Sequence, residues 1–284
     1  MRVTGLVRDP AGRFSWLKAA VLLIVLTPAA VLVLRWQTHD LGPRPNTEAI
    51  RFVGLWTIRF LVATLAVTPA RAVLDWGRVV MLRRMLGVTA ACYAILHLTL
   101  YAFDQKWRLL HVASEIALRF YLTIGFVALL GLLALAITST DGWQRRLGPR
   151  WKRLHKLVFP VGVLALLHYG IQSKADVTNM VFLAGLFVWL VGWRQLKRRW
   201  QQKLWPLPPL GIGAALAASV IEAAWYAVRN HVDPMLVWRT NFDLAYGPRA
   251  AVWVLIVGAV VFAFAALRRL RRRRTMPRGV VRQA

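Results

Sequence analysis

The sequence predicts an all-α integral membrane protein, a bundle of about eight transmembrane helices. Of its 284 residues 58% are hydrophobic, and the mean hydropathy is +0.50. Apolar runs near 20 residues recur along the chain, and each is long enough to cross a hydrocarbon core of about 30 Å as a helix. Backbone polar groups in lipid must be satisfied within the protein, and runs this continuous indicate helices rather than a barrel.

Eight apolar segments are the predicted spans, and they lie at 16–34, 50–68, 85–103, 120–138, 155–171, 178–193, 208–228 and 250–267. The first is long and lacks a convincing small-residue cleavage site, so we interpret it as a span and not as a signal peptide. Prolines at 206, 208 and 209 form a stiff break before the last two spans. We therefore expect a six-helix core, residues 1–200, and a two-helix C-terminal extension with a basic tail, residues 201–284.

The distribution of basic residues predicts the orientation. A formal net charge of +27 raises the hypothesis of a nucleic-acid partner. However, 27 of the 38 Lys and Arg residues lie on one side of the predicted membrane. They are found at the N-terminus, in the loops after spans two, four and six, and in the C-terminal tail. The positive-inside rule makes this side cytoplasmic, with both termini inside and no nucleic acid bound. The tail acts as a topology signal, and binding of anionic lipid headgroups is its alternative role.

Two histidines on different spans are predicted to share one depth. At a rise of ~1.5 Å per residue, His97 and His168 each lie ~20 Å from the cytoplasmic start of their spans. Two neutral imidazoles at one depth are what axial ligation of a haem iron requires, and buried structural histidines are the alternative. Ala90, Ala94 and Gly87 lie on or near the face of His97, where small residues leave room for a macrocycle or allow close helix packing.

A third histidine, His155, stands at the cytoplasmic end of span five. On an ideal helix it is turned by roughly 140° from His168, although Pro160 between them permits a kink. It is a candidate ligand of a second, inner haem, a contact of a propionate, or an interfacial residue. Five arginines are candidate partners of haem propionates or of a flavin, with membrane-flanking residues as the alternative: Arg119 at the outer level, and Arg83, Arg84, Arg150 and Arg153 at the inner level.

Other residues limit the possible chemistry. The only cysteine, Cys92, provides neither a disulfide framework nor a thiol pair. No glycine-rich nucleotide motif and no soluble domain is evident, so we do not expect the chain itself to oxidise a nicotinamide cofactor or to reduce a sulfoxide. Glu222 in span seven is costly in lipid and predicts a partner or a proton path.

A series of motifs resembles a known family. In order they are Arg83-Arg-Met-Leu-Gly87, Leu96-His97-Leu-Thr-Leu-Tyr101, Arg119-Phe-Tyr-Leu-Thr123-Ile-Gly125, Thr138-Ser-Thr140, Arg146-Leu-Gly148-Pro-Arg150-Trp-Lys-Arg-Leu-His155 and Leu167-His168-Tyr169. Over roughly residues 16–195 this set resembles the MsrQ family, the haem-binding membrane subunits of periplasmic methionine sulfoxide reductase systems. The wider group is the ferric-reductase-like transmembrane domain.

The resemblance implies b-type haem and FMN as cofactors, with His97, His155 and His168 as the functional histidines. It also implies an electron-transfer subunit of the bacterial inner membrane, with the quinone pool or a cytosolic flavin reductase as donor. Its partner would be a periplasmic molybdenum-containing reductase that repairs methionine sulfoxide in oxidised envelope proteins. The wider group usually has paired histidines on span three, whereas here Arg84 precedes His97 by 13 residues. One haem or two therefore both remain open.

Two other functions compete with this one. The first is a stand-alone transmembrane reductase of ferric chelates or quinones. The second is a transporter in which membrane histidines relay protons or metal ions, a function that acid–histidine pairs within the spans would favour. The predicted core contains almost no membrane-embedded carboxylate, which favours electron transfer.

Overall fold

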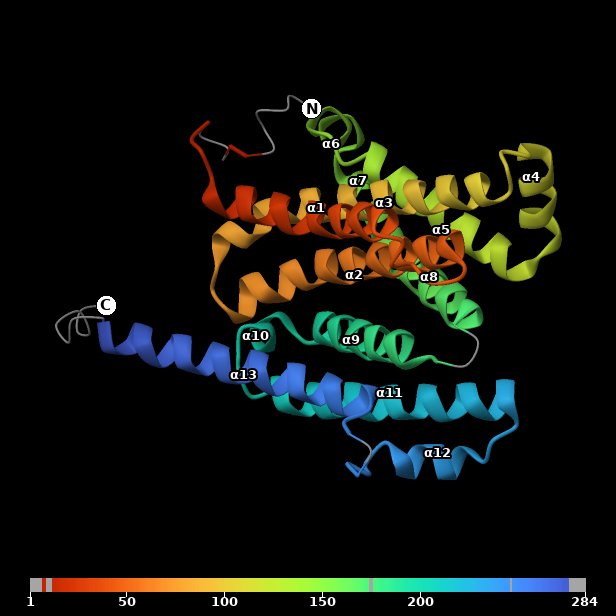
Figure 1. Cartoon of the computed structure of the whole chain (residues 1–284). Helices are drawn as coiled ribbons and strands as arrows, with labels where there is room; N and C mark the ends of the chain where they lie inside the picture. The colour runs from red at the N-terminus through yellow and green to blue at the C-terminus, as the bar shows by residue number, and fades with distance from the viewer. Residues whose placement is uncertain (1–6, 9–11, 174–175, 246, 276–284) are drawn as a thin grey trace. The chain divides into compact units, whose positions relative to one another are not determined.

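The computed structural model describes residues 7–8, 12–173, 176–245 and 247–275. Every regular element in these ranges is helical (Figure 1), which confirms the all-α prediction. Within the described residues seven helices are long and apolar enough to cross a membrane, and they correspond to predicted spans one to five, seven and eight. They are Trp16–Gln37, Pro45–Val73, Gly77–Asp104, Phe120–Ile137, Pro149–Gln172, Leu207–Asn230 and Ala250–Arg271.

The sixth predicted span forms α9 (Thr178–Gln195), an 18-residue helix that is not among these seven. It carries Asn179 and Arg194, which lower its hydropathy, and much of its surface is buried, including Val181, Leu183 and Phe187. A helix covered by protein needs less hydropathy than one facing lipid. The predicted number of membrane crossings is even only if α9 also crosses. The expectation that both termini lie on one side therefore depends on α9. Residues 1–6 and 276–284 at those termini lie outside the described ranges.

The chain divides into two compact units. The first comprises Met1–Val67 and Val79–Ala175, and the second comprises Thr68–Arg78 and Asp176–Ala284. The predicted boundary lies at residue 200, whereas the packing groups α9 with the C-terminal helices, because α9 contacts both α11 and α13.

The first unit contains most of the matched motifs. Its helices are α1 (Trp16–Gln37), α2 (Pro45–Val73) as far as Val67, α3 (Leu82–Asp104), α4 (Leu109–Leu118), α5 (Phe120–Ile137), α6 (Asp141–Leu147), α7 (Pro149–Leu154) and α8 (Val158–Gln172), with short 3-10 turns η2 (Gly77–Met81) before α3 and η3 (His155–Leu157) before α8. Helix α5 packs against α3, α4 and α8, so it lies at the centre of the contacts in this unit.

A tyrosine of α3 joins α1 at its proline. The Tyr93 hydroxyl donates to the Val25 carbonyl over 2.7 Å and accepts from the Ala29 N–H over 3.1 Å. Val25 and Ala29 are the pair that an uninterrupted helix would bond directly, and Pro28 stands between them. The hydroxyl therefore completes the hydrogen bonding of α1 where a proline and an inserted side chain disturb its ladder.

The second unit is a smaller helical bundle. It contains α9, α10 (Arg198–Gln201), α11 (Leu207–Asn230), α12 (Pro234–Thr240) and α13 (Ala250–Thr275). Helix α11 packs against α9, α12 and α13. At the meeting of α9, α11 and α13 stands Gly185, where an added Cβ would lie 2.6 Å from Val254 and 3.0 Å from Ala218. Glycine is required here by close approach rather than by backbone conformation.

Gly185→Ala is expected to destabilise the second unit, because the new methyl group forces α9 away from its neighbours. Overpacking of this kind costs about 1–3 kcal/mol. Gly213→Ala on α11 is the matched control, since nothing lies within 4 Å of its added Cβ. Thermal unfolding in detergent should show a lower midpoint for Gly185→Ala alone. Equal midpoints for the two variants would contradict the described packing.

Candidate functional site

His97 is held on α3 by a contact with α2. Its Nδ1 lies 2.9 Å from the carbonyl oxygen of Ile50. A carbonyl oxygen only accepts, so Nδ1 donates and the lone pair of Nε2 is left available to a ligand. The ring lies against Gly54 of the same helix, where an added Cβ would come within 3.0 Å of two ring atoms.

His168 repeats this arrangement on another pair of helices. Its Nδ1 lies 2.8 Å from the carbonyl oxygen of Tyr121 on α5, so α8 and α5 are joined as α3 and α2 are. The ring lies against Gly125, where an added Cβ would be 2.7 Å from ring atoms. Its Nε2 is likewise the nitrogen left for a ligand.

In both cases the accepting carbonyl and the glycine are four residues apart, at Ile50 and Gly54 and at Tyr121 and Gly125. In a helix the Cα–Cβ bond tilts toward the N-terminus, so a side chain covers the turn that precedes it. The carbonyl at position i already accepts one hydrogen bond within the helix. When position i+4 is glycine, no Cβ covers this carbonyl, and a second donor can reach it from the side. The two glycines are what allow the two imidazoles to reach these carbonyls.

The two histidine rings lie close together, as the prediction of a shared depth requires. Their ring centres are 6.2 Å apart, and their planes are nearly perpendicular at 87°. One metal ion bound by both imidazoles through bonds of about 2 Å would separate the ring centres by roughly 6 Å. The spacing therefore fits two axial ligands of one ion.

The described ranges contain no group of three or more His, Cys, Asp or Glu side chains placed to hold a metal ion. A bare ion between His97 and His168 would have only two protein ligands, below the usual four of a structural zinc site. A haem supplies four equatorial nitrogens itself and needs only axial ligands from the protein. The residues present fit a haem better than a bare ion.

The small residues near His97 are packed against protein. Ala90 and Ala94 are buried, and an added Cβ at Gly87 would lie 3.5 Å from Thr64 of α2. Of the two roles that the sequence permits for them, close helix packing agrees with this burial. The glycines that contact the histidines, Gly54 and Gly125, lie instead on the helices opposite.

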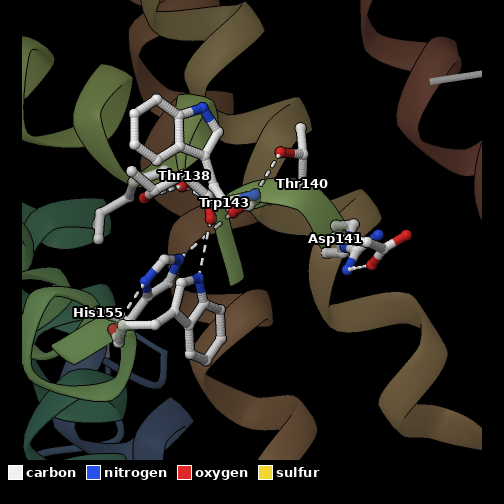
Figure 2. A network of polar contacts seen from close by, with 9 residues as sticks. Thr138, Thr140, Asp141, Trp143 and His155 are labelled. Carbon is white, nitrogen blue, oxygen red and sulfur yellow. Dashed lines mark hydrogen bonds and ion pairs between the residues drawn. The ribbon is translucent and has the colours of Figure 1, made fainter. Parts of the chain in front are cut away.

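His155 lies apart in a polar network at the start of η3. Figure 2 shows the network, in which Nδ1 of His155 is 3.2 Å from the Trp151 carbonyl and Nε2 is 3.4 Å from the Ser139 hydroxyl. Its ring stacks on Trp151 at 3.9 Å, and the Trp151 indole donates to the Thr138 carbonyl over 2.8 Å. Both ring nitrogens of His155 therefore contact oxygen atoms of the protein, whereas in His97 and His168 only Nδ1 has such a contact within the described ranges.

The predicted arginines divide between the two levels. Arg119 forms an ion pair with Glu115 and donates to the Tyr121 hydroxyl over 3.1 Å, so it contacts the residue whose carbonyl holds His168. Arg83 lies close enough to His155 to influence it electrostatically. Arg150 and Arg153 are exposed on α7, which ends just before His155.

Arg84 has a structural contact rather than a place beside a histidine. Its guanidinium bonds the Asp141 carboxylate at the start of α6 (Figure 2), and this hydrogen bond and charge lower the pKa of the Asp141 carboxyl below its ordinary value. Thr140 caps the same helix by accepting from the Trp143 N–H. The contact ties the start of α6 to the start of α3.

Glu222 forms an ion pair, although the sequence alone identifies no partner for it. Its Oε1 accepts from Arg249 just before α13, and Arg249 also donates to the Thr240 hydroxyl of α12 over 2.8 Å. The Glu222 side chain is 2% exposed, and its Oε2 has no hydrogen-bond partner among the described residues. The predicted need for a partner is confirmed, and the pair belongs to the second unit.

The chain is similar to known proteins over about two thirds of its length. Residues 53–166 match the family of ferric reductase like transmembrane components. Three similar proteins are each named protein-methionine-sulfoxide reductase heme-binding subunit MsrQ. The one from Xanthomonas campestris pv. campestris (strain 8004) is 43% identical over 190 residues, 64% of this chain and 86% of the relative. Those from Xanthomonas euvesicatoria pv. vesicatoria (strain 85-10) and Azospira oryzae are 40% and 36% identical, over 65% and 68% of this chain and 88% and 84% of the relatives.

The chain belongs to the MsrQ family. The match to the wider ferric-reductase group contains His97 and His155 and ends two residues before His168. Glu222 and Arg249 lie well beyond it. No solved structure matches the chain.

Proposed function

We propose that this protein is the haem-binding, electron-transferring membrane subunit of a methionine sulfoxide reductase system. The observation that supports this most directly is the facing pair His97 and His168, with ring centres 6.2 Å apart. The names of the MsrQ relatives, which describe heme-binding subunits of such a reductase, support it independently. Seven apolar helices place it in a membrane.

In this proposal His97 and His168 would hold one b-type haem, which would supply one-electron redox chemistry in the membrane. The carbonyls of Ile50 and Tyr121 fix the tautomer and orientation of each ring and raise the basicity of Nε2. Arg119 is the candidate for a propionate at this level.

The inner level is a weaker candidate for a second haem. His155 has both ring nitrogens directed at protein oxygen atoms, and Arg84 stands where the wider group has a histidine. A role of His155 with Arg83, Arg150 and Arg153 in binding a propionate or the FMN phosphate agrees better with this chemistry, because guanidinium groups bind carboxylates and phosphates.

The charge asymmetry supports the orientation of the protein in the membrane, and the direction of electron flow is part of the proposal. The basic side faces the cytoplasm of a bacterial inner membrane, so both termini and the core–extension boundary near residue 200 lie there. Electrons enter from the quinone pool or a cytosolic flavin reductase. The acceptor in this proposal is a periplasmic molybdenum-containing subunit that reduces methionine sulfoxide.

Replacing either facing histidine should abolish haem binding at this site. His97→Ala and His168→Ala each remove one axial ligand, and His111→Ala on α4 is the control. Haem per chain and the reduced-minus-oxidised visible spectrum of purified protein measure the outcome. We expect a low-spin b-type spectrum in the wild type and the control, and its loss in both variants. Full haem content in both variants would refute the assignment of ligands.

Gly125→Ala should weaken the haem site without touching a ligand atom. The new methyl group would occupy the space of the His168 ring, 2.7 Å away, and break its contact with Tyr121. We expect lower haem occupancy, on the order of tenfold as for loss of an outer-shell partner of a ligand. Gly142→Ala is the control, since nothing lies within 4 Å of its added Cβ. Unchanged haem content and spectrum in Gly125→Ala would show that the glycine is not needed for ligation.

Electron transfer to a partner is tested in proteoliposomes. The haem is first reduced with a quinol, or with NADH, FMN and a flavin reductase. We expect rapid reoxidation only when the molybdenum subunit and a methionine sulfoxide substrate are both present. Equally rapid reoxidation by a ferric chelate without that subunit would instead establish the stand-alone reductase.

A further inference from the structure

A basic cavity lies in the second unit, at a place that the proposed haem chemistry does not use. It has a volume of about 730 Å³ and is formed by the last turn of α2 with the residues after it, by α10 and by α13. Four guanidinium groups and one carboxylate line it, those of Arg71, Arg198, Arg268, Arg269 and Asp75. The arginines come from three separate segments of the chain and converge on one space.

The cavity stands where a membrane meets water. Arg71 is two residues from the end of the span Pro45–Val73, and Arg268 and Arg269 are near the end of the span Ala250–Arg271. Spans end close to the depth of lipid headgroups. Trp76 lies here too, with the Arg268 guanidinium 5.8 Å from its ring centre, as expected of an aromatic residue at the interface.

The walls have two chemical characters. One part is apolar and includes Val73, Trp193 and Ala265, which are 3%, 4% and 0% exposed and belong to one buried cluster. The other part holds the guanidinium groups. A ligand that fits both has an anionic group joined to an apolar body, which describes a phospholipid better than a free inorganic anion.

Backbone carbonyls compensate the positive charge only in part. The Arg269 guanidinium donates to the carbonyl of Gln202. At the end of α2 the carbonyls of Ala70 and Arg71 accept from the N–H groups of Leu74 and Trp76, over 2.9 and 3.2 Å. Asp75 is the only carboxylate that lines the cavity. The four arginines carry three more formal charges than the one carboxylate offsets, so the cavity attracts an anion.

We propose that this cavity binds the phosphodiester headgroup of an anionic phospholipid, with the guanidinium groups on the phosphate oxygens and the glycerol region against the apolar wall. Arginine suits this role because its planar fork binds two phosphate oxygens at once. Basic pockets between helices on the positively charged side of a membrane protein bind anionic headgroups in this way. The bound lipid would join the end of α2 to α10 and α13 and stabilise the second unit.

The test compares lipids and matched variants of the full-length protein. Thermal unfolding in neutral detergent is followed while phosphatidylglycerol or phosphatidylcholine is added, and native mass spectrometry counts the retained lipids. The cavity variant is Arg198→Gln with Arg268→Gln. The control is Arg145→Gln with Arg146→Gln, which removes the same charge from exposed positions on α6.

Phosphatidylglycerol should raise the unfolding midpoint of the wild type and the control, and phosphatidylcholine should not. The cavity variant should lose most of this gain, with apparent affinity lower by on the order of tenfold, and should retain one fewer phosphatidylglycerol molecule. If the double variant does not fold, Arg71→Gln and Arg268→Lys are measured singly, and each should bind the lipid more weakly than the control.

Two results would overturn the proposal. Equal gains in the cavity variant and the control would mean that the lipid responds to net charge and not to this cavity. Equal protection of the wild type by inorganic phosphate or FMN, lost in the cavity variant, would assign the cavity to a water-soluble phosphate instead. Neither readout depends on bound haem, so the outcome is independent of the proposed function.

Discussion

The arrangement of His97 and His168 depends on how an imidazole is held within a membrane. A histidine in hydrocarbon needs an acceptor for its N–H, and a membrane helix offers only carbonyls that already serve its own ladder. The first unit meets this need twice with a glycine four residues after the accepting carbonyl, at Ile50–Gly54 and Tyr121–Gly125. Because the missing Cβ is the atom that would cover that carbonyl, the ring can approach the helix from the side and use the second lone pair of the oxygen.

This arrangement fixes more than the position of the rings. A ring whose Nδ1–H is held by a carbonyl presents Nε2 in one tautomer and one orientation, and the centres of the two rings are 6.2 Å apart. Each ring also joins two helices, α3 to α2 and α8 to α5, so ligand orientation and helix packing are set by the same contacts. His155 lacks this arrangement, since its ring stacks on Trp151 within its own segment and its nitrogens both face protein oxygen.

Much of this could be predicted from the sequence, because hydropathy and helical rise are local properties. Seven predicted spans coincide with apolar helices, and the equal depths calculated for His97 and His168 correspond to facing rings. The sixth predicted span, α9, is not among the apolar helices, because its hydropathy is low for a span and its burial comes from α11 and α13, which follow it in the chain. The glycines behind the rings could not be assigned either. A glycine in an apolar helix reads as a packing residue until the helix that faces it is known, although Gly125 does fall within a matched motif.

Glu222 illustrates the same limit and also shows how the C-terminal extension is specified. Its partner Arg249 lies 27 residues further on, beyond a loop that contains α12, and no helical periodicity connects the two. A buried ion pair adds little net stability, because desolvating two charges offsets their attraction, but removing one partner leaves a costly charge behind. Arg249 also bonds Thr240, so α11, α12 and the start of α13 are held in one arrangement by three polar groups. Apolar surfaces alone would let these helices slide or rotate at small cost. The pair therefore selects one packing of the extension, and it does so at the opposite end of α13 from the arginines of the basic cavity.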